Sequence, residues 1–209
     1  MKISYKHLVK NIESNPSIEE LSEKLFQLGH EHEINKDIFD IEFTPNRGDC
    51  LSLNGLLRDL SIFYEVLNFN EIYNHEIKPF GMQFINNCSQ YCRKISFLKI
   101  EIDKIPNKYE DFLNDFFIDL DIKKNNFFTD ISNYISYETG QPTHCYDLAK
   151  IIEPIRLDFI ESKTEFETLL DKKISIDENN LVFYDNNNRV INLAGVIGSK
   201  DTACNKKTT

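Results

Sequence analysis

The hydrophobic periodicity of this chain changes from a helical period to a strand period near its N-terminus. Within residues 17–29 apolar side chains recur every three to four residues, at Ile18, Leu21, Leu25 and Leu28. Within residues 38–44 apolar and acidic side chains alternate, which is the period of a half-buried strand. A chain of 209 residues is long enough to bury a sizeable core. Because both periods occur in it, we predict an α+β fold.

The ends of the first predicted helix carry recognisable signals. Ser17 is a candidate N-cap, Glu20 completes a capping box three residues later, and Gly29 suits a C-terminal stop. Only about eight residues, 30–37, connect this helix to the strand. A second helix is predicted over residues 51–67, with an apolar face formed by Leu53, Leu56, Leu57, Leu60, Phe63 and Tyr64.

A domain boundary is predicted after the second helix. Residues 68–80 have no clean hydrophobic period, and Pro79 and Gly81 stand at their end. We therefore predict a small helix and strand domain over residues 1–78 and a mixed-sheet domain over residues 79–209. For the second domain we first predict a strand at residues 95–102 and a helix with Phe112, Leu113, Phe116 and Leu120 on its buried face. A short helix that Asp130 caps and Gly140 ends should follow. The rest is predicted to form strands at residues 155–160, 173–176, 181–185 and 190–196.

Composition excludes several classes of protein. The formal net charge of −10 argues against binding nucleic acid by phosphate neutralisation alone. No apolar run reaches the ~18 residues of a membrane span, and no apolar region follows the first lysines, so we expect a cytoplasmic protein without a membrane partner. The five cysteines are irregularly spaced and are interpreted as reduced thiols. A zinc site from Cys88, Cys92 and the adjacent His144 and Cys145 is the weaker interpretation, so no metal ligand is assigned.

Four stretches are more specific than composition. They are the opening residues MKIS, the segment TPNRGDCLS of residues 44–52 with GLLRDL at 55–60, the pair DISNY and ETGQPTHCYD within residues 130–147, and LAGVIG at 193–198. In order and spacing they resemble the signature segments of the β chain of bacterial phenylalanyl-tRNA synthetase. The resemblance covers essentially the whole chain. It implies an N-terminal structural domain followed by an editing domain that is incomplete at its C-terminus.

The resemblance also implies partners and a division of labour. In that family of ligases the α chain aminoacylates tRNA(Phe) and binds ATP, Mg²⁺ and phenylalanine, so no cofactor is expected in this portion. The β chain scaffolds an α₂β₂ heterotetramer that binds tRNA(Phe), and its editing domain hydrolyses mischarged Tyr-tRNA(Phe). An apolar pocket rejects an analogue with one added hydroxyl by only about 10², so a second, hydrolytic site is needed.

The matching positions give candidate editing residues. The resemblance places His144 as the catalytic residue, with Asn133, Ala194 and Gly195 in the substrate pocket. Each group has a structural alternative: His144 as an ordinary loop residue, and Gly195 and Gly198 as parts of a tight turn. Two charged residues of the first motif also have plain interpretations, namely Asp49 as the cap of the second helix and Arg47 as a member of an ion pair.

The chain departs from the family pattern in three respects. The short connection at residues 30–37 replaces an OB-fold tRNA-binding insertion, and the chain ends before a glutamate of the editing pocket. Lys123 stands where the family has arginine, and Ser199 where it has a second glycine; lysine lacks the planar fork of arginine. Two rival functions therefore stay open: a degenerate scaffold without hydrolytic activity, and a free-standing deacylase that edits in trans.

Overall fold

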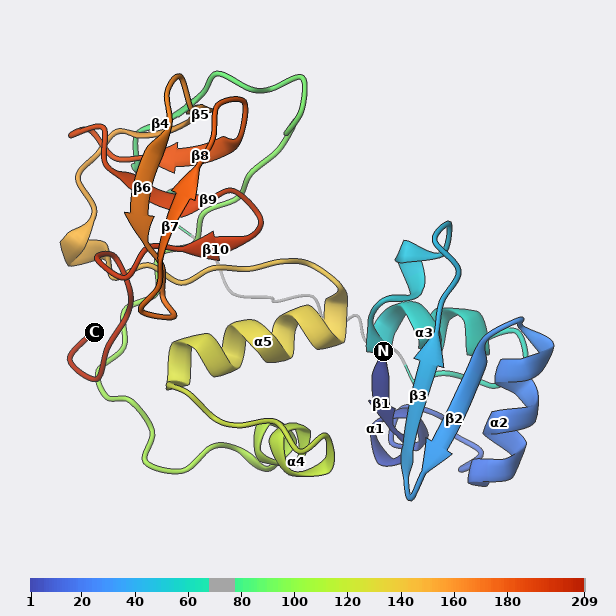
Figure 1. Ribbon diagram of the computed structural model, residues 1–209. Helices are drawn as coiled ribbons and strands as arrows, with labels where there is room; N and C mark the ends of the chain where they lie inside the picture. The colour runs from blue at the N-terminus through green and yellow to red at the C-terminus, as the bar shows by residue number, and fades with distance from the viewer. Residues whose placement is uncertain (68–77, 209) are drawn as a thin grey trace. The chain divides into compact units, whose positions relative to one another are not determined.

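The structure, a computed structural model, describes residues 1–67 and 78–208 and forms two compact units (Figure 1). The first unit comprises Met1–His75 and Pro106–Thr143, and the second comprises Glu76–Ile105 and His144–Thr209. Each unit combines helices or turns with a sheet, which confirms the predicted α+β class. Within the described ranges, no helix has the length and apolar character needed to cross a bilayer.

The first unit contains a three-stranded antiparallel sheet in the order β1-β3-β2. Its strands are β1 (Lys2–Ser4), β2 (Glu31–Asn35) and β3 (Ile38–Glu42). Phe39 and Ile41 of β3 are fully buried, so the predicted strand is confirmed, although it ends two residues early. The connection at residues 30–37 holds β2, which the sequence did not reveal because this edge strand is mostly exposed and lacks an alternating pattern.

Helices α1 (Tyr5–Val9) and α2 (Ile18–Gln27) connect β1 to β2, and α3 (Leu53–Leu60) follows β3. The capping box of α2 is formed, because Ser17 and Glu20 exchange hydrogen bonds between side chain and backbone. The prediction for the second helix was too long at both ends. A 3₁₀ turn at Gly48–Cys50 comes first, and Ser52, rather than Asp49, caps α3 through the Gly55 N–H.

Two further helices pack with the first unit, although they come later in the sequence. They are α4 (Asp111–Asp119) and α5 (Phe127–Thr139). One buried cluster joins them to residues of β1, β3 and the first three helices; α4 contributes Leu113, Phe116 and Phe117, and α5 contributes Tyr137. The Tyr137 hydroxyl also contacts His7 Nδ1 of α1 at 2.8 Å. The compact units therefore divide the chain differently from the predicted domains 1–78 and 79–209, and most of the predicted boundary segment 68–80 lies outside the described residues.

The caps of α5 correct one residue assignment. Asn126 caps the helix by accepting a hydrogen bond from the Thr129 N–H. Asp130, predicted as the cap, lies in the first turn, fully buried, and accepts hydrogen bonds from the Tyr109 hydroxyl and a backbone N–H. Gly140 ends the helix with a φ of +73°, as predicted for a glycine stop.

The second unit contains a five-stranded mixed sheet in the order β10-β9-β8-β5-β4 and a separate hairpin of β6 and β7. The strands are β4 (Phe84–Asn86), β5 (Ile155–Phe159), β6 (Thr164–Glu167), β7 (Lys173–Ile176), β8 (Leu181–Tyr184), β9 (Val190–Leu193) and β10 (Ile197–Gly198). Among the described strand pairs of this sheet, only β4–β5 is parallel. A buried cluster of Ile160, Phe166, Ile176, Val182 and Val190 lies between the hairpin and the sheet.

The predicted strands of the second unit are confirmed except for the first. Those at 155–160, 173–176, 181–185 and 190–196 correspond to β5, β7, β8 and β9 with small differences at their ends. The strand predicted at 95–102 is wrong, because these residues have no strand structure and Leu98 and Ile100 are 63 % and 64 % exposed. Phe97 of this segment instead packs its ring against Phe84 of β4, a side-chain contact without backbone pairing.

Candidate functional site

His144 opens a short segment that runs antiparallel to the chain after β10. Tyr146 pairs with Ala203 in an isolated bridge, and the Asp147 N–H donates to the Thr202 carbonyl at 3.0 Å. The His144 ring lies directly over Gly198 of β10. A Cβ atom at Gly198 would lie 2.1 Å from His144 Cε1 and 2.4 Å from Nε2, so only glycine leaves room for the imidazole.

The environment of His144 keeps its imidazole neutral. Burial lowers the pKa of His144 to about 4. Its Nε2 atom is buried and has no hydrogen-bond partner among the described residues. An unpaired buried ring nitrogen costs free energy, which a water or ligand that reached it would recover.

Tyr146 and Asn192 complete the surroundings of this ring. The Tyr146 ring meets the His144 ring edge to face, with centroids 4.4 Å apart. Burial raises the pKa of Tyr146 well above its usual range, and a hydrogen bond from the Asn192 side chain opposes that rise. Asn192 is 5 % exposed and lies opposite Gly198 in the β9–β10 pair. The segment 144–146 and the β9–β10 hairpin thus form one cluster, which we call the His144 cluster: His144, Tyr146, Asn192 and Gly198.

The predicted pocket residues Ala194 and Gly195 lie in the turn of the same hairpin. The Ala194 N–H donates to the Leu181 carbonyl, which fixes the turn against β8. Gly195 has a φ of +73°, and no atom lies within 4 Å of the position that a Cβ would occupy. Glycine at this position is therefore explained by the backbone conformation of the turn.

Asn133 belongs to the other unit. It is exposed on α5 in the first unit, whereas His144, Ala194 and Gly195 belong to the second. Its neighbour Tyr134 donates to Glu138 Oε1 at 3.0 Å and packs its ring against Phe116, so Tyr134 has a structural role in α5.

The two substituted family positions differ in what the structure shows. Ser199 is buried, donates its N–H to the Ile191 carbonyl, and accepts a hydrogen bond from the Asp201 N–H through its hydroxyl. Its φ is not positive, so the backbone at this position does not require glycine. Lys123 is exposed in the loop between α4 and α5.

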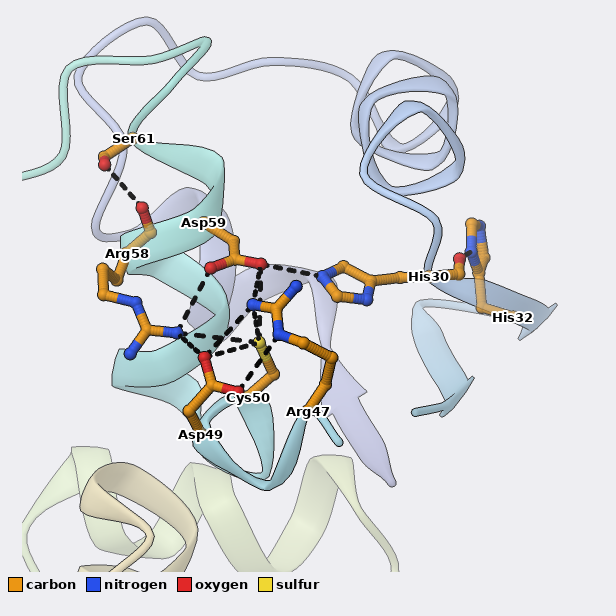
Figure 2. A network of polar contacts seen from close by, with 8 residues as sticks. All are labelled: His30, His32, Arg47, Asp49, Cys50, Arg58, Asp59 and Ser61. Carbon is orange, nitrogen blue, oxygen red and sulfur yellow. Dashed lines mark hydrogen bonds and ion pairs between the residues drawn. The ribbon is translucent and has the colours of Figure 1, made fainter. Parts of the chain in front are cut away.

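A second polar cluster lies in the first unit, where the motif of residues 44–60 folds onto α3 (Figure 2). Arg47 bonds Asp49 Oδ1 through Nε at 3.1 Å and also pairs with Asp59. Arg58 pairs with both of these aspartates. His30 Nε2 lies 3.1 Å from Asp59 Oδ2. The interpretation of Arg47 as a member of an ion pair is therefore confirmed, and Asp49 is one of its partners.

The charges of this network offset one another. A hydrogen bond from Arg47 lowers the pKa of Asp49 to about 2. For Asp59 burial acts to raise the pKa, but hydrogen bonds from Arg47 and Arg58 outweigh it and the pKa is lowered. Burial and the neighbouring Asp59 raise the pKa of the Cys50 thiol to about 11, so Cys50 is not a reactive thiolate.

Three atoms of the network have the chemistry of metal ligands. These atoms, which lie within 4.8 Å of one another, are His30 Nε2, Cys50 Sγ and an Asp59 oxygen. Imidazole nitrogen, thiolate sulfur and carboxylate oxygen are all zinc ligands in proteins. Arg47 Nη2, however, bonds both Cys50 Sγ, at 2.7 Å, and Asp59. The guanidinium thus already occupies the position of a cation and supplies its charge. We therefore interpret the network as a structural one that fixes the loop before α3.

The first two long motifs meet each other in the first unit. A Cβ at Gly140, the residue that ends α5, would lie 3.3 Å from Ser52 Cβ, the cap of α3. A Cβ at Gly55 would lie 2.1 Å from the Asp49 carbonyl oxygen. Both glycines and the serine are therefore explained by close packing between α3, its preceding loop and the end of α5.

The second motif and the LAGVIG segment lie in a region that a family model describes. The model of the B3/4 domain matches residues 96–209, which is more than half of the chain. The chain belongs to the B3/4 domain family. The match runs through α4, α5 and most of the second unit, although it begins after β4, so the B3/4 domain residues are shared between the two compact units.

Curated relatives extend the similarity to the N-terminal region. The chain is 31 % identical over 179 residues to the phenylalanine–tRNA ligase beta subunit of Ehrlichia canis (strain Jake), covering 80 % of this chain and 21 % of that protein. It is 28 % identical to the protein of the same name from Psychrobacter arcticus, covering 84 % of this chain and 22 % of that protein. It is also 28 % identical to the one from Pseudomonas putida, covering 92 % of this chain and 26 % of that protein. The predicted resemblance is confirmed. The chain spans about a fifth to a quarter of the length of these relatives.

A solved structure also aligns with the whole chain. It is an N-terminal fragment of the phenylalanyl-tRNA synthetase beta-subunit from Pyrococcus horikoshii, with a TM-score of 0.47 and 16 % identity, covering 100 % of this chain and 65 % of that one. This likeness is too low to add to the description of either unit.

Proposed function

We propose that this chain is part of the β subunit of a phenylalanine–tRNA ligase. The proposal is supported by the family match, the names of the relatives and the motifs that occur in family order. In such an enzyme ATP, Mg²⁺ and phenylalanine bind to the α chain, so this portion needs no cofactor of its own. Its partners are the α chain, in an α₂β₂ heterotetramer, and tRNA(Phe), and its location is the cytoplasm.

Within that subunit, the His144 cluster contributes to hydrolytic editing of Tyr-tRNA(Phe). The observation that carries this proposal is the neutral imidazole with a buried Nε2 that lacks a partner, beside the hairpin whose turn holds Ala194 and Gly195. In the reaction, water adds to the ester carbonyl, the ribose oxygen leaves with a proton, and free tyrosine and tRNA result. The exposed Gly195 turn offers main-chain groups to the substrate without a side chain in the way.

The pKa of His144, about 4, limits which role it takes in that reaction. A general base works best when its pKa lies near the working pH. His144 is too weak a base to carry the proton away efficiently at neutral pH. We assign it the role of a hydrogen-bond acceptor that orients the attacking water towards the carbonyl carbon.

A scaffold without hydrolytic activity is the second candidate function. It is favoured by the two departures from the family pattern, Lys123 in place of arginine and Ser199 in place of a second glycine. In that case the β-chain role reduces to supporting the α chain, and the B3/4 region keeps its fold without its chemistry.

Deacylation of Tyr-tRNA(Phe) by the full-length β chain with its α partner separates the two candidates. We expect His144→Ala to reduce hydrolysis by about 10²-fold while phenylalanylation is unchanged, since one positioned polar group is worth that order of rate. His32→Ala, in β2 of the first unit, is the matched control and should leave hydrolysis at the wild-type rate. Wild-type enzyme that hydrolyses Tyr-tRNA(Phe) no faster than a blank would establish the scaffold.

A further inference from the structure

The His144 cluster contains two residues for which the resemblance gave no role. Tyr146 meets the imidazole edge to face, with ring centroids 4.4 Å apart, and Asn192 is buried opposite Gly198 in the β9–β10 pair. The Gly198 main chain also lies close against the imidazole. The ring is therefore in contact with both an aromatic side chain and a strand.

We propose that Tyr146 is the positioning residue for His144. The inference rests on the proposed editing function. Edge-to-face aromatic contacts have a preferred geometry, so the Tyr146 ring restricts the tilt of the imidazole. The backbone adds a second restraint, because Tyr146 is paired with Ala203 while Asn192 and Gly198 are paired between β9 and β10.

This arrangement has a direct chemical consequence. A group that orients a water molecule must keep its own geometry, since a misplacement of about 1 Å costs about 10²-fold in rate. Without the Tyr146 ring, the imidazole gains space on one face, and Nε2 no longer points in a single direction. The loss falls on the hydrolytic step and not on the affinity for the aminoacyl-tRNA, because Tyr146 acts through His144.

Two substitutions at Tyr146 in the full α₂β₂ enzyme test the proposal. Tyr146→Leu removes the aromatic edge, and we expect kcat for Tyr-tRNA(Phe) hydrolysis to fall by about 10- to 100-fold with KM unchanged. Tyr146→Phe keeps the ring and should retain hydrolysis within about threefold of wild type. Tyr184→Phe, at a half-buried tyrosine of β8 in the same unit, is the control and should leave both constants unchanged.

A second readout does not depend on hydrolysis. Diethyl pyrocarbonate modifies accessible neutral imidazoles, and peptide mass spectrometry reports each histidine separately. We expect Tyr146→Leu to accelerate modification of His144 by about tenfold, with His32 as the internal reference, whereas Tyr146→Phe keeps the slow wild-type rate. If Tyr146→Leu leaves the modification rate of His144 unchanged, the positioning role is overturned.

The two readouts separate the two proposals. A wild-type enzyme without hydrolysis removes the editing function, while the modification rates still decide whether Tyr146 holds His144. An active wild-type enzyme whose Tyr146→Leu variant raises KM at constant kcat would make Tyr146 a substrate contact and would overturn the positioning role.

Discussion

At the scale of single residues, charged groups that look available in the sequence are occupied by one another. Arg47 and Arg58 share Asp49 and Asp59, and His30 closes the network from the end of α2. Because each guanidinium already has carboxylate partners, the motif presents little free positive charge to a phosphate. This network fixes the shape of the loop before α3 and stabilises the first unit.

Asp59→Asn tests how much this network contributes to the free energy of unfolding. The pKa of Asp59 is lowered in the folded chain, so its contribution is fully present above the ordinary value of 3.8 and is lost as the pH falls through the folded pKa. At pH 7 we expect Asp59→Asn to lower the free energy of unfolding by about 1–3 kcal/mol, since it weakens charge-assisted bonds in a half-enclosed site.

Urea unfolding between pH 2 and pH 7 provides the measurement. The difference between Asp59→Asn and wild type should shrink as the pH falls below 3.8. The exposed Asp37→Asn, also in the first unit, should unfold like wild type at every pH. A difference that stays constant down to pH 2 would show that the carboxylate charge contributes nothing.

At the scale of elements, the decisive feature of the second unit is the close approach of the segment 144–147 to β10. Gly198 has an ordinary φ, so its lack of a side chain is needed for the His144 ring alone. Gly195, three residues earlier in the same hairpin, shows the opposite case, with a positive φ and open space. The two positions therefore require glycine for different reasons: Gly198 leaves space for a neighbouring ring, and Gly195 adopts a positive φ.

Gly198→Ala should lower the free energy of unfolding of the second unit by about 1–3 kcal/mol, because the new methyl group overlaps the imidazole. In a His144→Ala background the same substitution should cost less than about 1 kcal/mol, since the space is then free. Urea midpoints of the four proteins measure the coupling. Gly48→Ala, with no atom near its would-be Cβ, is the control. Equal costs in both backgrounds would contradict the proposed steric reason.

At the scale of the whole molecule, the packing units do not follow the order of the sequence. The chain enters the second unit, returns with α4 and α5 to the first, and then completes the second. Phe116 of α4 is 2 % exposed within the core of the first unit. The B3/4 match at 96–209 therefore includes helices that stabilise the N-terminal residues.

Phe116→Ala tests this division by amide hydrogen exchange. Truncation of a buried phenylalanine costs about 3–5 kcal/mol, so the amides of β1 and β3 should lose protection. The amides of β8 and β9 in the second unit should keep theirs. Phe112→Ala on the same helix, where Phe112 is 49 % exposed, should change little. Loss of protection in β8 and β9 alone would instead support a domain that begins near residue 79.

The sequence by itself determined the local structure wherever one strong signal was complete within a few residues. The capping box of Ser17 and Glu20, the alternation in β3, the helix stop at Gly140 and the strands β5, β7, β8 and β9 were all predicted correctly. The motifs also determined the family. Caps, periods and turns are set by neighbouring residues, which explains why reasoning from the sequence reaches them.

Only the tertiary structure decided which segments lie together. The sequence did not reveal the edge strand β2, the lack of a strand at residues 95–102, the return of α4 and α5 to the first unit, or the contact between His144 and Gly198. Each depends on the availability of a neighbouring strand or on space between residues far apart in the chain. Side-chain patterns record how much of a segment is buried, but they do not record which partner buries it.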